Sequence, residues 1–269
     1  MRVEGGLRTK GVEKNQSKDT PLISIITVVY NNDRTLERAI ESVSRQNYEN
    51  VEYLVIDGGS TDGTLDIIKK HEKHIDYYRS EPDGGIYDAM NKGIGLCRGQ
   101  LIGLLNSDDW YEDNALSTVA DAYREDDDSI QYGICRHHDR LGPIMLGSPL
   151  AERLPERMIA HATVFVPATF YRDLGRFDTR YRIAADYDLM LRFFMKKKRF
   201  RLHCEVLANF EIGGACHQNL AVSRDEINTI KYRHGIISIK EKQRLDVKNR
   251  LRRGVEILQQ SVGKLKREN

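Results

Sequence analysis

The chain has 269 residues, of which 30% are charged and 40% are hydrophobic, and its formal net charge is +2. No apolar run approaches the roughly 18–20 residues that a membrane-spanning helix needs. The four cysteines show neither metal-type spacing nor a disulfide framework. We therefore expect a cytoplasmic protein with reduced thiols. The polar residues 1–20 lack the apolar segment of a signal peptide, and we predict that they form a disordered lead-in.

Charge is distributed unevenly along the chain. Residues 231–269 contain twelve Lys and Arg against four Asp and Glu, a net charge of +8, which leaves −6 for the rest of the chain. An acidic body with a basic tail predicts an anionic partner for the tail.

Apolar runs alternate with helical patterns in the first half of the chain. Residues 21–32 form a near-continuous apolar run, which is typical of a strand buried on both faces. Asp33 is expected to cap the following helix, and its apolar stripe is Leu36, Ala39, Ile40 and Val43. Further strands are predicted at 51–57, 75–80 and 101–105, and further helices at 65–71 and 114–125. This alternation predicts right-handed βαβ units and a mostly parallel sheet.

The pattern changes after residue 128. Residues 129–147 are predicted to form two strands joined by a polar turn, and a helix is predicted to start at Asp186. Residues 199–214 alternate like a half-exposed strand. This part indicates an α+β arrangement added to the same sheet.

The tail is predicted to be helical. Its apolar stripe steps alternately by four and three residues and consists of Val247, Leu251, Val255, Leu258, Val262 and Leu265. Such a stripe can lie on an anionic membrane, pair with another helix or pack on the protein itself.

Polar clusters follow three of the predicted strands. They are Tyr30-Asn31-Asn32, the segment 57–62 and the segment 106–109. In a doubly wound sheet these strand ends meet at one edge and can converge on one ligand. An aromatic ring can stack on a base, a carboxylate can accept a base N–H, and further carboxylates can hold ribose and a metal on a diphosphate. Hard oxygen ligands suit Mg²⁺ or Mn²⁺.

Each cluster by itself would be ordinary turn chemistry, since Asn, Asp, Gly and Ser are common turn residues. Their occurrence at three equivalent strand ends favours a nucleotide site. The segment after the first strand, VVYNNDRT, has no Gly-rich phosphate loop. This counts against a P-loop kinase and a nicotinamide dehydrogenase.

The segments SIITVVYNNDRTLERAIESVSRQNYENVEYLVIDGGSTDGT, EPDGGIYDAMNKGIGLCRGQLIGLLNSDDWY and IAADYDLMLR resemble glycosyltransferase family 2. The resemblance covers residues 21–214. It implies the GT-A fold, an α/β architecture with a Rossmann-like, mostly parallel central sheet and helices on both faces. The helical tail is then a C-terminal extension of that fold.

The resemblance also implies which residues bind the donor. Tyr30 lies at the position beside the nucleotide base, and Asp57 at the position that contacts the base N–H. The other nucleotide-binding positions fall on Asn32, Asp83 and Asp108.

The NSDD segment occupies the place of the family's DxD motif. Asp109 is the predicted metal ligand, with Asp108 and His217 as further candidates for the metal. Asn106 stands where many relatives have Asp, so we expect it to support the loop. Asp88 and Asn91 are expected to support the donor site, with Asn91 bracing the metal loop.

The family's catalytic base is the Asp of a Glu-Asp pair that opens a helix. Here the matching residue is Asp186, preceded by Ala185 in place of the Glu, and Asp188 is the reserve. A carboxylate at a helix start is by itself most simply a cap. With a donor site upstream, Asp186 becomes the candidate for deprotonating an acceptor hydroxyl. His161 is either an acceptor contact or a structural histidine.

These inferences define three regions. Residues 1–20 are the lead-in, residues 21–222 the GT-A domain and residues 223–269 the basic amphipathic tail. Within the domain we expect a nucleotide-binding half at about 21–128 and an acceptor half at about 129–222.

The predicted activity is metal-dependent, inverting transfer of one sugar from a nucleotide sugar. UDP-hexose is favoured because many relatives use UDP. The expected acceptor is a saccharide, and a lipid-linked one in bacterial surface polysaccharide synthesis would suit the tail on the inner face of a membrane. The processive-synthase signature Gln-x-x-Arg-Trp is missing, which favours single additions.

Three alternatives remain at this stage. A sugar nucleotidyltransferase shares the nucleotide-binding architecture but would want a basic Gly-rich loop after the first strand. An inactive nucleotide-sugar or glycan-binding relative is the second alternative. Nucleic-acid binding by the tail is the third, and it is not favoured.

Overall fold

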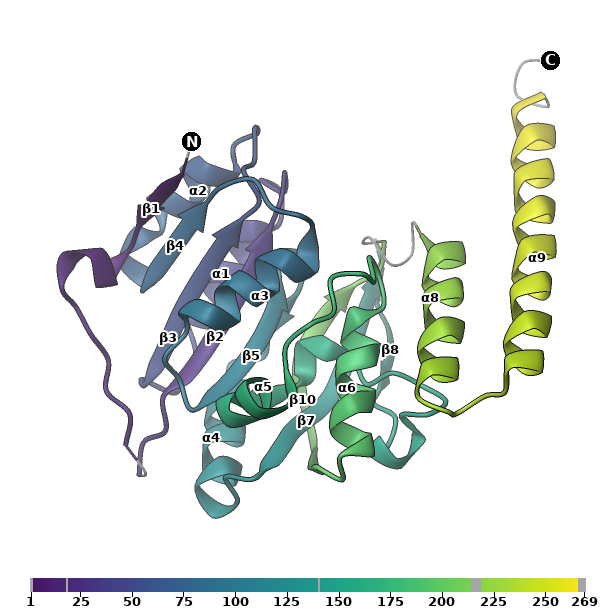
Figure 1. The fold of residues 1–269 in the computed structure, drawn as a ribbon. Helices are drawn as coiled ribbons and strands as arrows, with labels where there is room; N and C mark the ends of the chain where they lie inside the picture. Colours follow the sequence, from purple (N-terminus) through teal and green to yellow (C-terminus); the bar gives the residue numbers. More distant parts are fainter. Residues whose placement is uncertain (1, 18, 140, 214–218, 266–269) are drawn as a thin grey trace.

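The computed structural model describes residues 2–17, 19–139, 141–213 and 219–265, with side chains described up to residue 253 (Figure 1). One ten-stranded sheet, in the order β1-β4-β3-β2-β5-β9-β7-β10-β6 with β8 on β7, runs through it. The strands are β1 (Val3–Gly5), β2 (Ile23–Val29), β3 (Val51–Asp57), β4 (Tyr77–Ser80), β5 (Leu101–Asn106), β6 (Trp110–Tyr111), β7 (Ser129–Asp139), β8 (Gly142–Gly147), β9 (Phe165–Pro167) and β10 (Arg199–Glu211).

The first half of the sheet is parallel, as the alternation of elements predicted. Strand β2 pairs in parallel with β3 and β5, and β3 pairs in parallel with β4. All seven residues of β2 are buried, which explains the unbroken apolar run there. In the second half β7 and β10 are parallel, whereas β6, β8 and β9 are antiparallel to their partners. The edge strand β1 of the first half is also antiparallel to its partner β4.

Helices cover both faces of the sheet. One face packs against α3 (Ile86–Leu96), α5 (Ala168–Leu174) and α6 (Ala185–Met195). The other packs against α1 (Leu36–Ser44), α2 (Thr64–Lys70) and α4 (Ala115–Glu125). The predicted stripe of α1 is fully buried. Short 3₁₀ turns are η1 (Leu7–Lys10), η2 (Glu72–His74), η3 (Ala151–Arg153) and η4 (His161–Thr163).

Two helices form the C-terminal extension, α8 (Leu220–Arg233) and α9 (Ile239–Leu265). Helix α8 contacts α6 through the buried Ile230, and α9 packs on α8 (Figure 1). Asn249 of α9 is buried and donates to the Ala221 carbonyl at 3.0 Å. One side of the tail, the side of α9 that carries Asn249, therefore packs on the protein itself. No helix in the described ranges is both long and apolar enough to cross a membrane.

Two local predictions were wrong. Residues 3–5 are not disordered, because β1 pairs with the edge of β4 and the Glu4 side chain accepts from Arg79 Nε at 3.0 Å. Asp33 does not cap α1, which begins at Leu36 after Thr35 without a side-chain cap. The Asp33 N–H instead donates to Asp62 Oδ2 at 3.3 Å, because the backbone of residues 31–33 bonds to the segment after β3.

Candidate active site

The three polar strand ends meet at one edge of the sheet. In the parallel register Val29 pairs with Asp57 and Val28 pairs with Asn106. Side chains then tie the three loops together. Asn31 Oδ1 accepts from the Thr61 N–H at 2.8 Å, and Asn32 Nδ2 donates to Ser107 Oγ at 2.9 Å.

The aromatic ring predicted beside the base is open to solvent. Tyr30 is 64% exposed. Gly58 lies against it, since a Cβ on Gly58 would meet Tyr30 Cδ2 at 3.3 Å and Asp83 Oδ2 at 2.7 Å. Burial raises the pKa of the Asp83 carboxyl. Tyr30, Gly58 and Asp83 thus form a compact wall on which a flat ring can lie.

Asp57 lies beneath this wall and is almost fully buried. Its carboxylate accepts from the Ser60 N–H at 3.1 Å and from Ser80 Oγ at 2.6 Å. These bonds hold the turn after β3 against β4. Asp83, which is half-buried and nearer the surface, is better placed than Asp57 to accept an N–H from a base.

The donor-side turn before α3 is held by its own carboxylates. Asp83 Oδ1 accepts from the Gly85 N–H at 2.8 Å, and Asp88 Oδ2 accepts from the Gly84 N–H at 3.0 Å. The predicted role of Asn91 is wrong. Its amide bonds both to the Phe177 carbonyl, at 2.9 Å, and to the Phe177 N–H, at 3.0 Å. Asn91 therefore braces the segment before α6, not the NSDD loop.

The two adjacent aspartates of the NSDD loop differ in access. Asp109 is 0% exposed, and its Oδ1 accepts from the Glu211 N–H at 3.2 Å. Asp109 Oδ2 has no hydrogen-bond partner among the described residues. Burial and the nearby Asp108 hold the pKa of Asp109 well above its ordinary value. Asp108 is only partly buried, and burial raises its pKa as well.

An arginine that the sequence analysis missed supports this loop. Arg38 of α1 donates through Nη2 to the Asp108 carbonyl at 2.7 Å and to Glu211 Oε2 at 3.1 Å. Its guanidinium lies 3.7 Å from the centre of the Trp110 ring. Arg38 lies on the polar face of α1, where a charged residue is ordinary. Its contact with the NSDD loop joins residues 70 positions apart, so the local sequence pattern gave no sign of it.

The residues at this edge fit a divalent metal that is shared with a diphosphate. No cluster of three or more His, Cys, Asp or Glu that could hold a metal occurs within the described ranges. Mg²⁺ commonly takes only one or two carboxylates and completes its shell with water and phosphate oxygens. Asp108 offers such a partly exposed carboxylate, whereas Asp109 is fully buried and its Oδ2 has no partner among the described residues. His217, the other predicted metal candidate, lies outside the described residues.

His161 lies between the predicted base, Asp186, and the NSDD loop. Asp186 lies in the first turn of α6 with its side chain 23% exposed. His161 Nδ1 is 3.8 Å from Asp186 Oδ2, and His161 Nε2 is 3.0 Å from Asn106 Nδ2. The Tyr87 hydroxyl lies 3.1 Å from Asp186 Oδ1. His161 and Asn106 thus link the donor loop to the carboxylate of α6.

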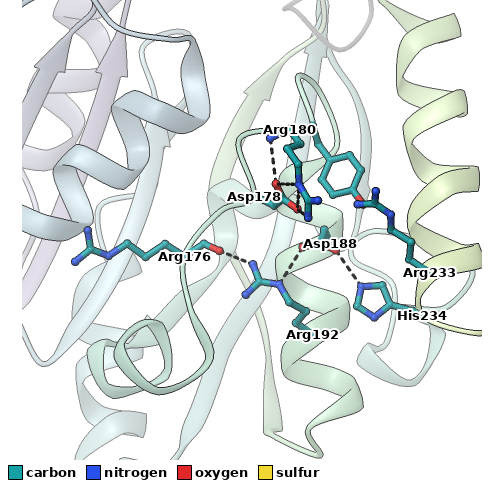
Figure 2. A pocket seen from close by; sticks show the side chains of 8 residues that line it. Arg176, Asp178, Arg180, Asp188, Arg192, Arg233 and His234 are labelled. Atoms are coloured by element: carbon teal, nitrogen blue, oxygen red, sulfur yellow. Dashed lines mark hydrogen bonds and ion pairs between the residues drawn. The ribbon is translucent and has the colours of Figure 1, made fainter.

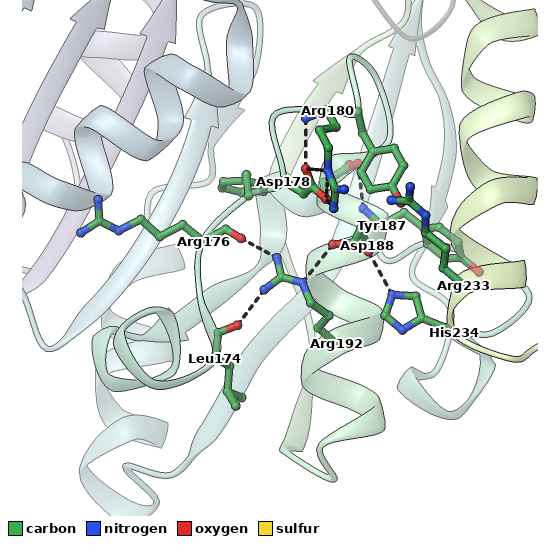
Figure 3. A network of polar contacts seen from close by, with 12 residues as sticks. Leu174, Arg176, Asp178, Arg180, Tyr187, Asp188, Arg192, Arg233 and His234 are labelled. Carbon is green, nitrogen blue, oxygen red and sulfur yellow. Dashed lines mark hydrogen bonds and ion pairs between the residues drawn. The ribbon is translucent and has the colours of Figure 1, made fainter.

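Asp188 lies elsewhere, although it is only two residues from Asp186. It is buried, and it accepts from Arg192 Nε at 2.9 Å while its other oxygen lies 2.9 Å from His234 Nε2 (Figure 3). Arg192 also donates to the Leu174 carbonyl at 2.7 Å. Asp188 is therefore a tie between α6 and α8, and both of its oxygens are occupied. This arrangement does not suit the predicted reserve base.

Asp188 also lines a pocket of about 380 Å³ between α6 and the end of α8 (Figure 2). The pocket is lined by Arg176, Asp178, Arg180, Tyr181, Asp188, Arg192, Arg233 and His234. Two of its four arginines are paired with its two aspartates, Arg180 with Asp178 and Arg192 with Asp188, so the lining keeps an excess of positive charge. None of the strand-end residues lines it, so it is separate from the candidate active site.

Comparison with known proteins agrees with this arrangement. The family model described as glycosyl transferase family 2 matches residues 24–163. The chain is 32% identical, over 204 residues, to a PGL/p-HBAD biosynthesis glycosyltransferase of Mycobacterium bovis, covering 72% of this chain and 78% of the relative. It is also 32% identical to chondroitin synthase of Escherichia coli, over 67% of this chain and 28% of that much longer protein.

Among solved structures, residues 1–349 of S. aureus TarS in complex with UDP-GlcNAc share this fold. The TM-score is 0.66 at 16% sequence identity, and the match covers 84% of this chain and 71% of the TarS fragment. At this identity the likeness establishes the arrangement of helices and strands and no more.

Proposed function

The chain belongs to glycosyltransferase family 2 and has the GT-A fold, and from this premise we propose that it transfers a single sugar from UDP-hexose to a saccharide hydroxyl with inversion. The observation that carries the proposal is the link from Asn106 of the NSDD loop through His161 to Asp186. This link supports a single site in which the NSDD loop and the partly exposed Asp186 carboxylate act together. The UDP complex of a similarly folded protein supports the choice of nucleotide.

On the donor side, Tyr30 stacks on the base and Asp83 accepts its N–H. Asp57 holds the turn beneath them, and Asn32 holds the first strand end to the NSDD loop. We assign the divalent metal, Mn²⁺ or Mg²⁺, to Asp108 in place of the predicted Asp109. When bound, that metal neutralises the diphosphate that leaves.

On the acceptor side, Asp186 takes the proton of the attacking hydroxyl. The acceptor oxygen forms a bond to the anomeric carbon as the bond from that carbon to the diphosphate breaks, and the electron pair leaves with UDP. His161 and Tyr87 orient the Asp186 carboxylate. One base and one in-line displacement invert the anomeric centre without a covalent enzyme intermediate.

We further propose that the acceptor is lipid-linked, that the product enters polysaccharide biosynthesis, and that the protein works on the inner face of a membrane. The basic tail supports this location. The sequence allowed the tail to lie on a membrane, pair with another helix or pack on the protein. The side of α9 that carries Asn249 packs on α8, while Val247 and Leu251 of α9 remain exposed.

Product stereochemistry tests the proposal directly. The protein is incubated with Mn²⁺, a panel of α-linked UDP-hexoses and oligosaccharide acceptors, and the first product is followed by ¹H NMR. We expect a β-anomeric signal that appears together with free UDP. An α-linked first product would contradict the single-displacement mechanism, and transfer only from donors other than UDP would contradict the nucleotide.

A further inference from the structure

The hairpin of β7 and β8 exposes large apolar side chains. Leu141 at its turn is 97% exposed, and Ile144, Met145 and Leu146 of β8 are 54–60% exposed. Successive side chains of a strand point to opposite faces. Ile144 and Leu146 therefore lie on one face of β8 and Met145 on the other. We call these four residues the apolar hairpin tip.

Exposed apolar side chains are concentrated on the acceptor side of the molecule. Fourteen large ones are exposed in the described part of the chain, and ten of them lie on β8, next to either of its ends, or on α8 and α9. The ten are Leu141, Ile144, Met145, Leu146, Leu150, Leu220, Tyr232, Ile239, Val247 and Leu251. Figure 1 shows β8 on the α8 side of α6, across the molecule from β1 and β4. Clusters of this kind mark interaction surfaces.

The two C-terminal helices are strongly basic. Residues 231–253 contain nine Lys and Arg against Glu241 and Asp246, a net charge of +7. Polybasic segments with apolar neighbours bind anionic bilayers, because the basic side chains meet lipid phosphates while apolar side chains enter the interface. Charge complementarity thus points to an anionic lipid surface.

The shape of the hairpin favours a bilayer over a second protein chain. A strand added to the free edge of β8 would leave the side chains on both faces of β8 uncovered, and Pro143 lacks the N–H that such pairing uses. A protein packed on one face would leave either Met145 or Ile144 and Leu146 in water. Lipid at a membrane interface surrounds both faces and the turn.

We propose that the apolar hairpin tip inserts into the interface of an anionic bilayer while the basic residues of α8 and α9 lie against its headgroups. This proposal rests on the proposed location at a membrane, and it adds the hairpin tip to the basic tail as a second contact with the bilayer. Strand β7 leads from the tip to His138, whose ring centre is 4.7 Å from that of Trp110, next to the NSDD loop. Docking by the tip therefore brings the active site close to lipid-linked acceptors.

Vesicle binding of the full chain tests the proposal. Ile144→Ser/Leu146→Ser removes two exposed side chains of the tip. Val12→Ser/Met195→Ser removes two exposed apolar side chains elsewhere, which are 45% and 51% exposed against 54% and 60% at the tip. Co-sedimentation is measured with phosphatidylcholine vesicles with and without phosphatidylglycerol. We expect the tip variant to bind the anionic vesicles at least about tenfold more weakly than wild type, and the control to bind like wild type.

A tail variant separates the two contacts. Lys240→Gln/Arg244→Gln/Lys248→Gln is expected to reduce the preference for phosphatidylglycerol. Tryptophan emission of Leu141→Trp is expected to shift to the blue on addition of vesicles and to be quenched by brominated lipid. Hydrolysis of UDP-hexose in the absence of vesicles should be unchanged in the tip variant, so its result is independent of the proposed activity.

Three outcomes would overturn the proposal. The first is a tip variant that binds vesicles as tightly as wild type. The second is a wild-type protein that binds no vesicles while it hydrolyses UDP-hexose, which would leave the proposed activity intact. The third is a wild-type dimer in sedimentation velocity that the tip substitutions alone convert to monomer, because the tip would then contact a second copy.

Discussion

Each half of the domain contains two aspartates that are close in sequence and have different environments. In the nucleotide-binding half, Asp108 is partly exposed and Asp109 is fully buried with one oxygen lacking a partner among the described residues. In the acceptor half, Asp186 is accessible and Asp188 is buried between Arg192 and His234. In each pair one carboxylate is partly exposed and the other is buried.

The buried members of the two pairs differ in how their charge is compensated. Asp188 has two cationic or cation-forming partners, which makes it a structural tie whose loss exposes unpaired groups. Burial and the nearby Asp108 charge raise the pKa of Asp109, and the Glu211 N–H that it accepts opposes this shift only in part. Residue type alone does not distinguish these roles.

The largest expected effect separates Asp186 from Asp188. Asp186→Asn should lower sugar transfer roughly 10²–10⁴-fold, the usual contribution of a positioned base, with UDP binding retained. Asp188→Asn should leave transfer within a few-fold of wild type. Steady-state transfer and UDP titration by calorimetry would measure both. Equal losses in the two variants would remove the assigned difference between them.

The next effect separates Asp108 from Asp109. Asp108→Asn should weaken Mn²⁺-dependent UDP binding by about tenfold or more, because it neutralises the accessible carboxylate. Asp109→Asn retains an oxygen for the Glu211 N–H, and it should keep that binding. Thermal shift with UDP at increasing Mn²⁺ gives the comparison. Loss of the metal effect only in Asp109→Asn would restore the original assignment.

A smaller effect concerns stability. Asp188→Asn leaves Arg192 and His234 without their carboxylate and should lower the free energy of unfolding by about 2 kcal/mol, less than for a fully buried pair because Arg192 is partly exposed. Asp178→Asn is the matched control, since Asp178 pairs with the exposed Arg180 and should cost below about 1 kcal/mol. Urea unfolding measures both. Similar values for the two variants would contradict the tie between α6 and α8.

The sheet and the convergence of its strand ends could be predicted because buried parallel strands have an unbroken apolar signature. Which carboxylate of each close pair is buried could not be predicted from the sequence. The partner of Asp109 is the Glu211 N–H of β10, 102 residues away in the sequence, and a partner of Asp188 is His234, 46 residues away. A local sequence pattern does not reveal contacts between residues so far apart in the chain. Asn91 shows the same limit, since its partner Phe177 is 86 residues away.

The lead-in was wrongly predicted for a related reason. Residues 3–5 are too short and polar for a strand signal, and only the open edge of β4 gives them a partner. The Glu4 side chain then accepts from the Tyr77 hydroxyl, from Arg2 and from Arg79. The Tyr77 bond is the main cause that lowers the pKa of Glu4 to about 2.

This lowered pKa gives the smallest predicted effect. Because the folded pKa is below the unfolded one, Glu4 stabilises the fold above the unfolded pKa of about 4.3, and the contribution is lost as the pH falls towards 2. The side chain is largely exposed, so Glu4→Gln should cost below about 1 kcal/mol at neutral pH. Urea unfolding at several pH values should show the difference from wild type shrinking steadily below pH 4. A difference that does not depend on pH would mean that Glu4 acts through packing of β1 on β4 and not through its charge.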